Sequence, residues 1–337
     1  METTRIVLAH RPHGEPTEHD LPIETAPLPA PAPGQALLQT LWLSLDPYMR
    51  GRMSDAKSYA PPVELGQTMV GGTVSRVLEC PGGEFAPGDI VLGYGGWQTH
   101  SVEGAAGLRR LDPTVAPVQT ALGVLGMPGF TAYSGLLEIG RPQPGETVVV
   151  AAATGPVGSA VGQIARIKGA RAVGIAGGPD KVAFLRELGF DAAIDRRADD
   201  FRRQLAEATP DGIDVYFENV GGAVFDAVLP RLNEFGRVPV CGLVSGYNAT
   251  SLPQGHDRLG LLMGRILQSS LTVRGFIQRE FVPDHVADFQ RDMPAWIAEG
   301  SVRYREDVVD GLGNAVAAFR GLLRGDNFGK LIVRVAQ

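Results

Sequence analysis

The stretch that decides the fold is Ala151-Ala152-Ala153-Thr154-Gly155-Pro156-Val157-Gly158. A β-branched run at 147–150 precedes it, and apolar residues then recur at helical spacing until Gly169 ends the segment. A second apolar run follows at 172–176. The pattern predicts a strand, a tight turn, a helix and a parallel strand, with the glycine-bearing turn at the carboxyl end of the first strand.

A turn of this kind suits a dinucleotide. Gly155 lets the backbone approach a pyrophosphate, Gly158 lets the helix pack closely on the strand, and the helix N-terminus offers free N–H groups. The match to G-x-G-x-x-G is imperfect, because Ala153 takes the first glycine position and Pro156 removes one donor. Taken alone, the turn could equally be a tight junction without a ligand, but the strand–helix–strand context favours a nucleotide.

The residues after the second strand indicate which nucleotide binds. An NAD site would normally place Asp or Glu there to bond the ribose 2′-hydroxyl. This chain instead has Gly177 and Gly178, and then the bases Lys181, Arg196 and Arg197. Because lysine and arginine bind a 2′-phosphate that an acid would repel, the sequence favours NADP(H). Any one of these bases alone could also be a solvated surface residue.

Strands and helices continue to alternate, which predicts a doubly wound parallel sheet of about six strands. Further strands are predicted at 213–219, 237–241 and 271–276, and helices at 128–139, 179–188, 222–232, 257–267 and 284–299. Ligands bind outside the carboxyl ends of such strands, so the segments 219–222, 241–245 and 276–278 are expected to face the cofactor. The alternative for each segment is an ordinary βα loop.

The segments before and after this alternating region have a different pattern. Residues 1 to about 124 are β-rich, with short apolar segments broken by Pro and Gly, and a final strand at 330–335 is expected to return to this part. The 337 residues carry a net charge of −6, which argues against nucleic acid, and only two cysteines, which excludes a disulfide framework. No apolar run approaches a membrane span, and the first residues have no signal-peptide core, so a cytoplasmic protein is expected.

Four further stretches carry a resemblance: 43–53 around Asp46-Pro47-Tyr48, 123–133 around Met127-Pro128-Gly129, 217–222 and 325–330. They resemble the zinc-independent double-bond reductases of the leukotriene B4 dehydrogenase/prostaglandin reductase group, within the medium-chain dehydrogenase/reductase superfamily. The segment 54–62 is similar to that of bacterial NADPH-dependent curcumin reductases. The resemblance covers nearly the whole chain.

The resemblance implies an α/β protein with two domains: a GroES-like β-rich catalytic domain at 1–124 and 309–337, and a Rossmann NADP(H)-binding domain at 125–308. It places the pyrophosphate at Gly155, Pro156, Val157 and Gly158, and the 2′-phosphate at Lys181. It implies further cofactor contacts at Asn219, Cys241, Gly242, Leu243, Val244, Ser245, Tyr247, Phe276, Ile277, Gln278 and Asn327. Animal relatives carry a tyrosine where this chain has Arg196. The arginine could stack on adenine and pair with the phosphate. Relatives are usually homodimers.

The chain lacks the sequence features of a zinc site. Gly66-Gln67-Thr68 stands where zinc-dependent relatives have Gly-His-Glu, and no histidine stands in metal-ligand spacing with another His or Cys. Without a Lewis acid, polarising a simple ketone or alcohol is hard. Conjugate reduction fits the absence of a Lewis acid. Hydride adds to the β-carbon, and the resulting enolate requires only hydrogen-bond donors and a proton at the α-carbon.

A phenol hydroxyl is a suitable donor for that enolate. Tyr59 and Tyr247 are the catalytic candidates, and the resemblance places both near the nicotinamide or the substrate. Tyr48 is a third candidate, and Tyr48, Tyr59 and Met127 are expected to contact the substrate. Each tyrosine could instead be an aromatic packed in a loop. The prediction is a metal-free NADPH-dependent reductase of the C=C bond of enones and enals, with curcumin-like compounds among the candidate substrates. The alternatives are an NADPH quinone reductase and a non-catalytic NADPH-binding protein.

Overall fold

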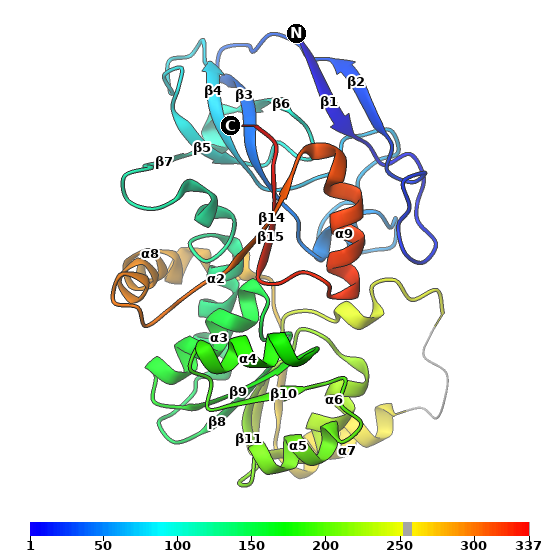
Figure 1. Cartoon of the computed structure of the whole chain (residues 1–337), viewed down its shortest axis with the longest axis vertical. Helices are drawn as coiled ribbons and strands as arrows, with labels where there is room; N and C mark the ends of the chain where they lie inside the picture. The colour runs from blue at the N-terminus through cyan, green and yellow to red at the C-terminus, as the bar shows by residue number, and fades with distance from the viewer. Residues whose placement is uncertain (252–257, 337) are drawn as a thin grey trace. The chain divides into compact units, whose positions relative to one another are not determined.

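The computed structural model describes residues 1–251 and 258–336, and the chain divides into two compact units (Figure 1). Unit 1 comprises 1–123 and 306–337, and unit 2 comprises 124–305. The second boundary falls three residues before the one expected from sequence, at 306 rather than 309. It does so because strand β14 (Glu306–Asp310) pairs along its length with β15 (Lys330–Arg334) of unit 1.

Unit 2 is built on a six-stranded parallel sheet with the order β10-β9-β8-β11-β12-β13. Its strands are β8 (Thr147–Ala151), β9 (Arg171–Ala176), β10 (Ala192–Asp195), β11 (Ile213–Phe217), β12 (Leu232–Val240) and β13 (Thr272–Gly275). The first three strands run outward from β8 to one edge and the last three to the other, so the order reverses between β8 and β11. The predicted doubly wound sheet is confirmed, and this reversal is where such sheets bind ligands.

Helices cover both faces of the sheet. They are α2 (Met127–Ser134), α3 (Pro156–Ile167), α4 (Pro179–Glu187), α5 (Phe201–Ala208), α6 (Gly222–Val228), α7 (Leu259–Gln268) and α8 (Val282–Ala298). Alternate residues of β8 point to opposite faces: Val148 and Val150 pack with α2, α3, α4 and α8, whereas Val149 and Ala151 pack with α5 and α6. A strand buried on both sides reads as an unbroken apolar run, which is why 147–150 could be recognised from sequence.

Several element bounds differ from those expected. Strand β12 begins at Leu232, five residues before the predicted 237, and the helix expected at 128–139 is α2 followed by a π-helical turn, Gly135–Gly140. The predicted helix at 257–267 is observed as α7, and its first predicted residue lies outside the described part of the chain.

Unit 1 contains a hairpin and a larger sheet. The hairpin pairs β1 (Glu2–Ile6) with β2 (Ile23–Pro27). The larger sheet has the order β14-β15-β3-β4-β5-β7, with β6 also pairing with β3. Its remaining strands are β3 (Gln35–Ser44), β4 (Thr73–Glu79), β5 (Ile90–Gly93), β6 (His100–Gly104) and β7 (Arg109–Leu111). Strand β15 lies antiparallel to β3, so the expected return of the last strand to the N-terminal part is confirmed.

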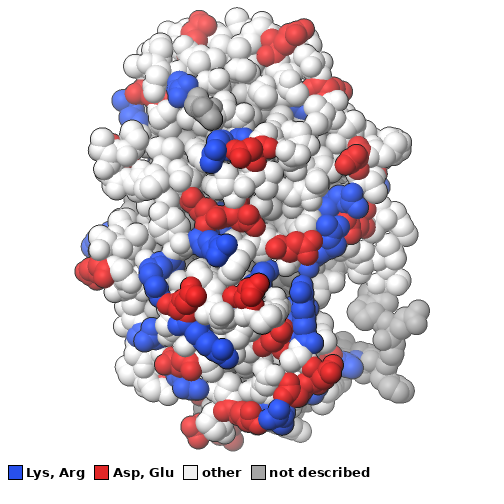
Figure 2. Space-filling model, in the orientation of Figure 1, with Lys and Arg blue, Asp and Glu red and all other residues white. Residues whose placement is uncertain are grey.

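The α-helices among the described residues of unit 1 are α1 (Tyr48–Arg52) and α9 (Ala315–Arg324). Helix α9 buries Phe319 edge-on against Trp97, with ring centroids 5.4 Å apart, in a core shared with α1 and β15. Across 1–251 and 258–336, no helix has both the length and the apolarity needed to cross a membrane. On the face drawn in Figure 2, basic and acidic side chains are interspersed.

Candidate functional site

The turn after β8 has the geometry of an anion-binding helix start. Ala152 adopts a left-handed conformation with φ of 49°, and Gly155 then caps α3. The first bond of the helix runs from Ser159 N to Gly155 O at 2.9 Å, so the N–H groups of Val157 and Gly158 precede it. A Cβ atom at Gly158 would lie only 2.5 Å from Ala152 O, which explains the glycine there. The predicted close packing of helix on turn is confirmed.

Basic side chains gather beyond the ends of β9 and β10. A Cβ atom at Gly177 would lie 3.0 Å from Arg197 Nε and 3.3 Å from Arg196 Nε, so both guanidinium groups reach this turn. Lys181 lies half-buried in the first turn of α4. The Asp195 carboxylate accepts hydrogen bonds from Gly178 N and Arg197 N, each at 2.9 Å, and so closes the turn. The structure brings Arg196 and Arg197 together at the Gly177 turn, and Lys181 follows four residues later in α4, so their predicted contact with a 2′-phosphate stays a prediction.

The segments after β11 and β12 meet beside the end of β8. Asn219 Nδ2 donates to Ala151 O at 2.8 Å, which ties the end of β11 to that of β8. Cys241 N and Gly242 N donate to Glu218 O at 2.9 and 3.1 Å. Two of the segments expected to face a cofactor are therefore adjacent, and the one after β11 lies where the strand order reverses.

Glu218 is a buried carboxyl at this point that the sequence analysis did not select. Its Oε1 accepts from Tyr216 Oη at 3.0 Å, Val220 N at 2.6 Å and Gly221 N at 2.8 Å. Burial raises the pKa of Glu218, and these hydrogen bonds oppose that rise. Its Oε2 is buried without a hydrogen-bond partner among the described residues. The carboxyl therefore fixes the turn after β11 through one oxygen.

Cys241 and Tyr247 follow β12. Burial, with a smaller contribution from the Glu218 charge, raises the pKa of the Cys241 thiol to about 12. A thiol with that pKa is protonated at neutral pH, which agrees with the interpretation of Cys241 as a small lining residue and not a nucleophile. The Tyr247 hydroxyl lies over Gly242, where an added Cβ atom would be 3.3 Å away.

The other residues of the 241–245 segment form a short surface turn. Leu243 is exposed, Val244 N donates to Asn219 O at 3.2 Å, and Ser245 Oγ donates to Val220 O at 2.6 Å. These bonds join the loop after β12 to the loop after β11. The segment is thus held at the end of the sheet mainly through its backbone.

Phe276, Ile277 and Gln278 follow β13 and are all half-buried. The Phe276 ring packs on Gly135, whose added Cβ would lie 2.4 Å from it, and near Phe217 at a centroid distance of 6.1 Å. Because its side chain is used in this packing, a cofactor contact at Phe276 would come through the backbone. Ile277 N donates to Glu280 Oε1 at 2.7 Å.

In unit 1, two of the tyrosines predicted at the substrate surround an arginine. The guanidinium carbon of Arg52 lies 4.6 Å from the ring centroid of Tyr59 and 5.8 Å from that of Tyr48. Tyr59 is 49% exposed, whereas burial, followed by the Asp46 charge, raises the pKa of Tyr48. The sequence quoted Arg52 within a motif but gave it no role.

A buried ion pair holds the start of α1. Lys330 Nζ of β15 donates to Asp46 Oδ1 at 2.9 Å, to Leu45 O at 2.8 Å and to Leu331 O at 3.1 Å. The Ser44 hydroxyl donates to the other oxygen of Asp46. Burial lowers the pKa of Lys330, and the Asp46 carboxylate opposes that shift. The last strand thereby positions the segment that carries Tyr48 and Arg52.

Two further predicted residues are Asn327 and Met127. Asn327, of unit 1, lies before β15, where its Nδ2 donates to Gly329 O at 2.8 Å. Met127, of unit 2, is the first residue of α2 and accepts a hydrogen bond at its carbonyl from Thr131 Oγ1 at 2.7 Å. Their predicted contacts with cofactor and substrate stay predictions.

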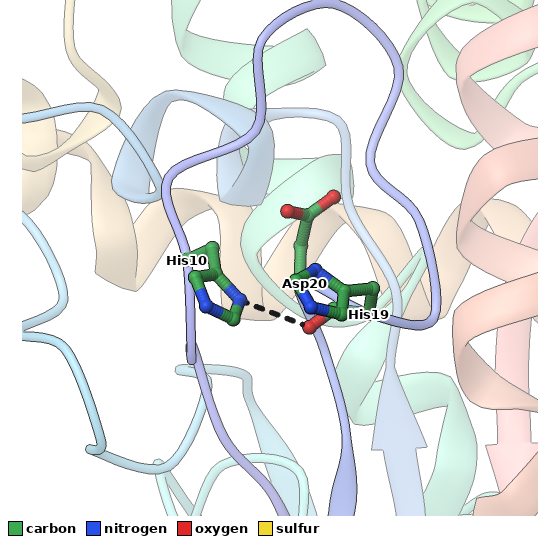
Figure 3. Close-up of side chains that lie close together, drawn as sticks. All are labelled: His10, His19 and Asp20. Atoms are coloured by element: carbon green, nitrogen blue, oxygen red, sulfur yellow. Dashed lines mark hydrogen bonds between the residues drawn. The ribbon is translucent and has the colours of Figure 1, made fainter.

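The structure also joins two histidines that are nine residues apart in sequence (Figure 3). The rings of His10 and His19 stack with centroids 4.2 Å apart, and their ligand atoms lie within 4.8 Å of each other and of a carboxylate oxygen of Asp20. His10 Nδ1 lies 3.2 Å from His19 O, and Asp20 Oδ2 accepts from Thr17 N at 2.8 Å and Thr17 Oγ1 at 2.7 Å. These contacts join the two sides of the loop between β1 and β2.

Comparison with known proteins agrees with both units. Residues 4–111 match the model for the N-terminal domain of oxidoreductases, and residues 156–298 match the model described as zinc-binding dehydrogenase. The chain is 55% identical over 333 residues to the NADPH-dependent curcumin reductase of Escherichia coli strain K12, covering 98% of this chain and 96% of that protein. The chain belongs to the medium-chain dehydrogenase/reductase family.

Within this family it falls in the group that contains the curcumin and prostaglandin reductases. It is 41% identical to prostaglandin reductase 1 of Rattus norvegicus, covering 95% of each protein. A crystal structure of CurA from Vibrio vulnificus in complex with NADPH matches with a TM-score of 0.96 and 52% identity, covering 99% of both chains. This medium-chain dehydrogenase/reductase is therefore an oxidoreductase with the two-domain fold that the resemblance implied.

Proposed function

We propose that the protein uses NADPH to reduce the C=C bond of α,β-unsaturated carbonyl compounds, that is, enones and enals, including curcumin-like dienones. The observation that carries the proposal is the 52% identity, over 99% of both chains, to CurA, which was crystallised with NADPH. The curcumin and prostaglandin reductases among its relatives support the class of reaction. NADPH would supply the hydride, which adds to the β-carbon of the substrate.

The residues of unit 2 would bind the cofactor. The N–H groups at the start of α3 suit the pyrophosphate. Arg196 and Arg197, which both reach the Gly177 turn, and Lys181 in the first turn of α4 suit the 2′-phosphate. The backbone of the loops after β11, β12 and β13 would line the ribose and nicotinamide. Asn327 of unit 1 is proposed as a further contact.

The remaining chemistry needs hydrogen-bond donors and a proton. As charge moves to the carbonyl oxygen, a phenol donating to that oxygen would stabilise the enolate, and a proton then adds to the α-carbon. We assign the donor role to Tyr59 and Tyr247, with Tyr48 and Met127 contacting the substrate. The proposal requires no metal, since the substrate's own conjugation delocalises the charge.

The decisive experiment follows the absorbance of reduced nicotinamide. NADPH and NADH are each tested against a short 2-alkenal, an enone, curcumin and a quinone, and NADP⁺ is tested against a saturated alcohol. Oxidation of NADPH by the conjugated carbonyls, giving a saturated C–C bond and an intact carbonyl, supports the proposal. Turnover confined to the quinone, or NADPH binding without any turnover, would overturn it in favour of a quinone reductase or a non-catalytic binding protein.

Tyrosine variants test the donor assignment. Tyr59→Phe and Tyr247→Phe should each lower kcat by about a hundredfold to a thousandfold while the Kd for NADPH changes little, because this is the usual loss when one hydrogen-bond donor to a developing oxyanion is removed. Tyr304→Phe removes a hydroxyl from a half-exposed position of unit 2 and serves as the control. Equal kcat values for parent and Tyr59→Phe across the pH range would remove Tyr59 from the mechanism.

A homodimer is part of the proposal. Strand β13 lies at the edge of its sheet and all four of its residues are exposed. Helix α7 exposes large apolar side chains, namely Leu259, Leu261, Met263 and Leu267. Apolar side chains on a helix together with an open sheet edge are features of a protein interface. Light scattering would test it, and a cytoplasmic location stays a prediction.

A further inference from the structure

The loop between β1 and β2 brings three metal-ligating side chains to one place (Figure 3). One ring nitrogen each of His10 and His19 and one carboxylate oxygen of Asp20 all lie within 4.8 Å of one another. Both histidines are exposed, and Asp20 is half-buried. Ala9 N donates to Asp20 O at 2.8 Å, so a backbone bond holds the two sides of the loop together beside these side chains.

Small rotations bring these atoms to bonding distance of one ion. Zn²⁺ binds nitrogen and oxygen ligands at about 2.0–2.2 Å, which places the ligands of a tetrahedral site about 3.4 Å apart. The two rings are nearly parallel, with 8° between their planes and centroids 4.2 Å apart. Because both side chains are exposed, each ring can tilt while the backbone stays in place. The tilt gives up the ring stacking and at most the solvent-exposed contact between His10 Nδ1 and His19 O, at 3.2 Å.

The donor set selects the class of ion. Two imidazoles and one carboxylate suit Zn²⁺, Co²⁺, Ni²⁺ and Cu²⁺, whereas Mg²⁺ and Ca²⁺ prefer oxygen ligands. Asp20 Oδ2 accepts from Thr17 N at 2.8 Å and Thr17 Oγ1 at 2.7 Å, and hydrogen bonds of this kind orient a ligating carboxylate. Burial lowers the pKa of Arg50, and the Asp20 charge opposes that shift. Because this guanidinium offsets the carboxylate charge, the imidazoles supply most of the affinity.

We propose that His10, His19 and Asp20 bind one divalent transition-metal ion of the Zn²⁺ class. The ion clamps the base of the loop, which Arg11 Nη1 joins to the segment 53–63 by donating to the carbonyl oxygens at its two ends, at 3.0 and 3.2 Å. Binding stabilises the fold, because the folded chain holds the three ligands together and the unfolded chain does not. The inference is independent of the proposed function, which requires no metal.

Calorimetry of the metal-free protein, without an affinity tag, tests the site with Zn²⁺ and with Mg²⁺. We expect one Zn²⁺ per chain and no binding of Mg²⁺. His10→Gln and His19→Gln should each weaken Zn²⁺ binding by at least about tenfold, since even the loss of an outer-shell partner typically costs about tenfold to a hundredfold. His285→Gln is the matched control and should keep the parent affinity, because His285 Nε2 also lies beside a carboxylate, 3.2 Å from Glu138 Oε1.

Urea unfolding separates binding at the folded loop from binding to scattered surface groups. Zn²⁺ should raise the midpoint of the parent and leave that of His10→Gln nearly unchanged. Without metal the two proteins should unfold alike, because the side chain is exposed. The inference is overturned if the parent binds no Zn²⁺, if it binds Mg²⁺ equally well, or if both histidine variants keep the parent affinity.

Discussion

The turn after β8 and the cluster around α1 are built in opposite ways. The turn is one continuous segment, 152–158, whose shape comes from its backbone and from small side chains. The cluster takes its polar groups from distant segments: Lys330 and Asp46, which bond at 2.9 Å, are 284 residues apart in sequence. A site made of consecutive small residues can be recognised in a sequence, whereas one made of side chains from distant segments cannot.

The two regions should also fail for opposite reasons. At Gly158 the turn has no room for an added atom, since a Cβ there would meet the backbone of Ala152 and Ala153 at 2.5 and 2.7 Å. The cluster has buried charges that are stable only as a pair, because each would otherwise be desolvated alone. Adding volume should therefore damage unit 2, and removing charge should damage unit 1.

The largest effect is expected for Lys330→Met. The variant leaves the Asp46 carboxylate buried without its cation, and breaking a buried pair in this way costs about 3–5 kcal/mol. Urea unfolding of the variant should show the loss as a lower midpoint. The double variant Lys330→Met/Asp46→Asn removes both charges and should recover part of the stability. A single variant within about 1 kcal/mol of the parent would show that the pair is effectively solvated.

The contrast between local and distant contacts also explains which parts of the fold could be predicted from the sequence. The apolar run of β8, the spacing of α3 and the alternation after it gave the parallel sheet and the position of the turn, because each follows from local pattern and burial. The bounds of β12 were wrong at one end, since its first residues, from Leu232, lack a continuous apolar run. The segments containing Asp46 and Lys330 were both singled out, but nothing in sequence shows that these residues touch.

Other members of the site depend on tertiary structure in the same way. Glu218 becomes a buried hydrogen-bond acceptor only once β11 lies between β8 and β12. Asp195 faces the Gly178 amide from the neighbouring strand, 17 residues away in sequence. The π-helical turn after α2 breaks a helix that local propensity would continue, and Phe276 packs against Gly135 there.

The second-largest loss of stability is expected for Gly158→Ala, which adds volume to the turn after β8. The new Cβ must push α3 away from the Ala152 carbonyl, and overpacking of this kind costs about 1–3 kcal/mol. NADPH affinity should fall with it, because the helix start moves. Gly155→Ala is the matched control, since its Cβ would meet only Ala152 O, at 3.3 Å. Equal losses of affinity in the two variants would mean that contact with the cofactor, and not helix packing, sets the requirement for glycine.

A smaller and more selective effect is expected for Lys181→Ala. Loss of one charge from the group near Gly177 should weaken NADPH by about tenfold, the lower range for a charge-assisted hydrogen bond, and leave NADH nearly unchanged. Fluorescence titration with both nucleotides measures the ratio, and Arg196→Ala tests the neighbouring guanidinium in the same way. Lys168→Ala, at the opposite end of α3, is the control. Parallel losses for both nucleotides would show that Lys181 does not bind the 2′-phosphate.

The smallest effect is a pH dependence from Glu218. Its pKa in the folded protein is raised by burial, so the protonated form is favoured there. The stability that it contributes is therefore present below the ordinary glutamate pKa, about 4.3, and is lost as the pH rises through the folded pKa. Glu218→Gln keeps an oxygen for the Val220 and Gly221 amides but does not titrate.

The unfolding free energy of the parent, relative to Glu218→Gln, should accordingly fall as the pH increases from about 4 towards neutral. Urea midpoints at several pH values measure the difference, and Glu234→Gln, at an exposed position, is the control. A constant difference would mean that the three hydrogen bonds to Oε1 fully offset the cost of burial. The turn after β11 would then stabilise the Glu218 carboxylate largely through backbone amides. Unit 1 differs, because there the Asp46 carboxylate is stabilised by the Lys330 side chain.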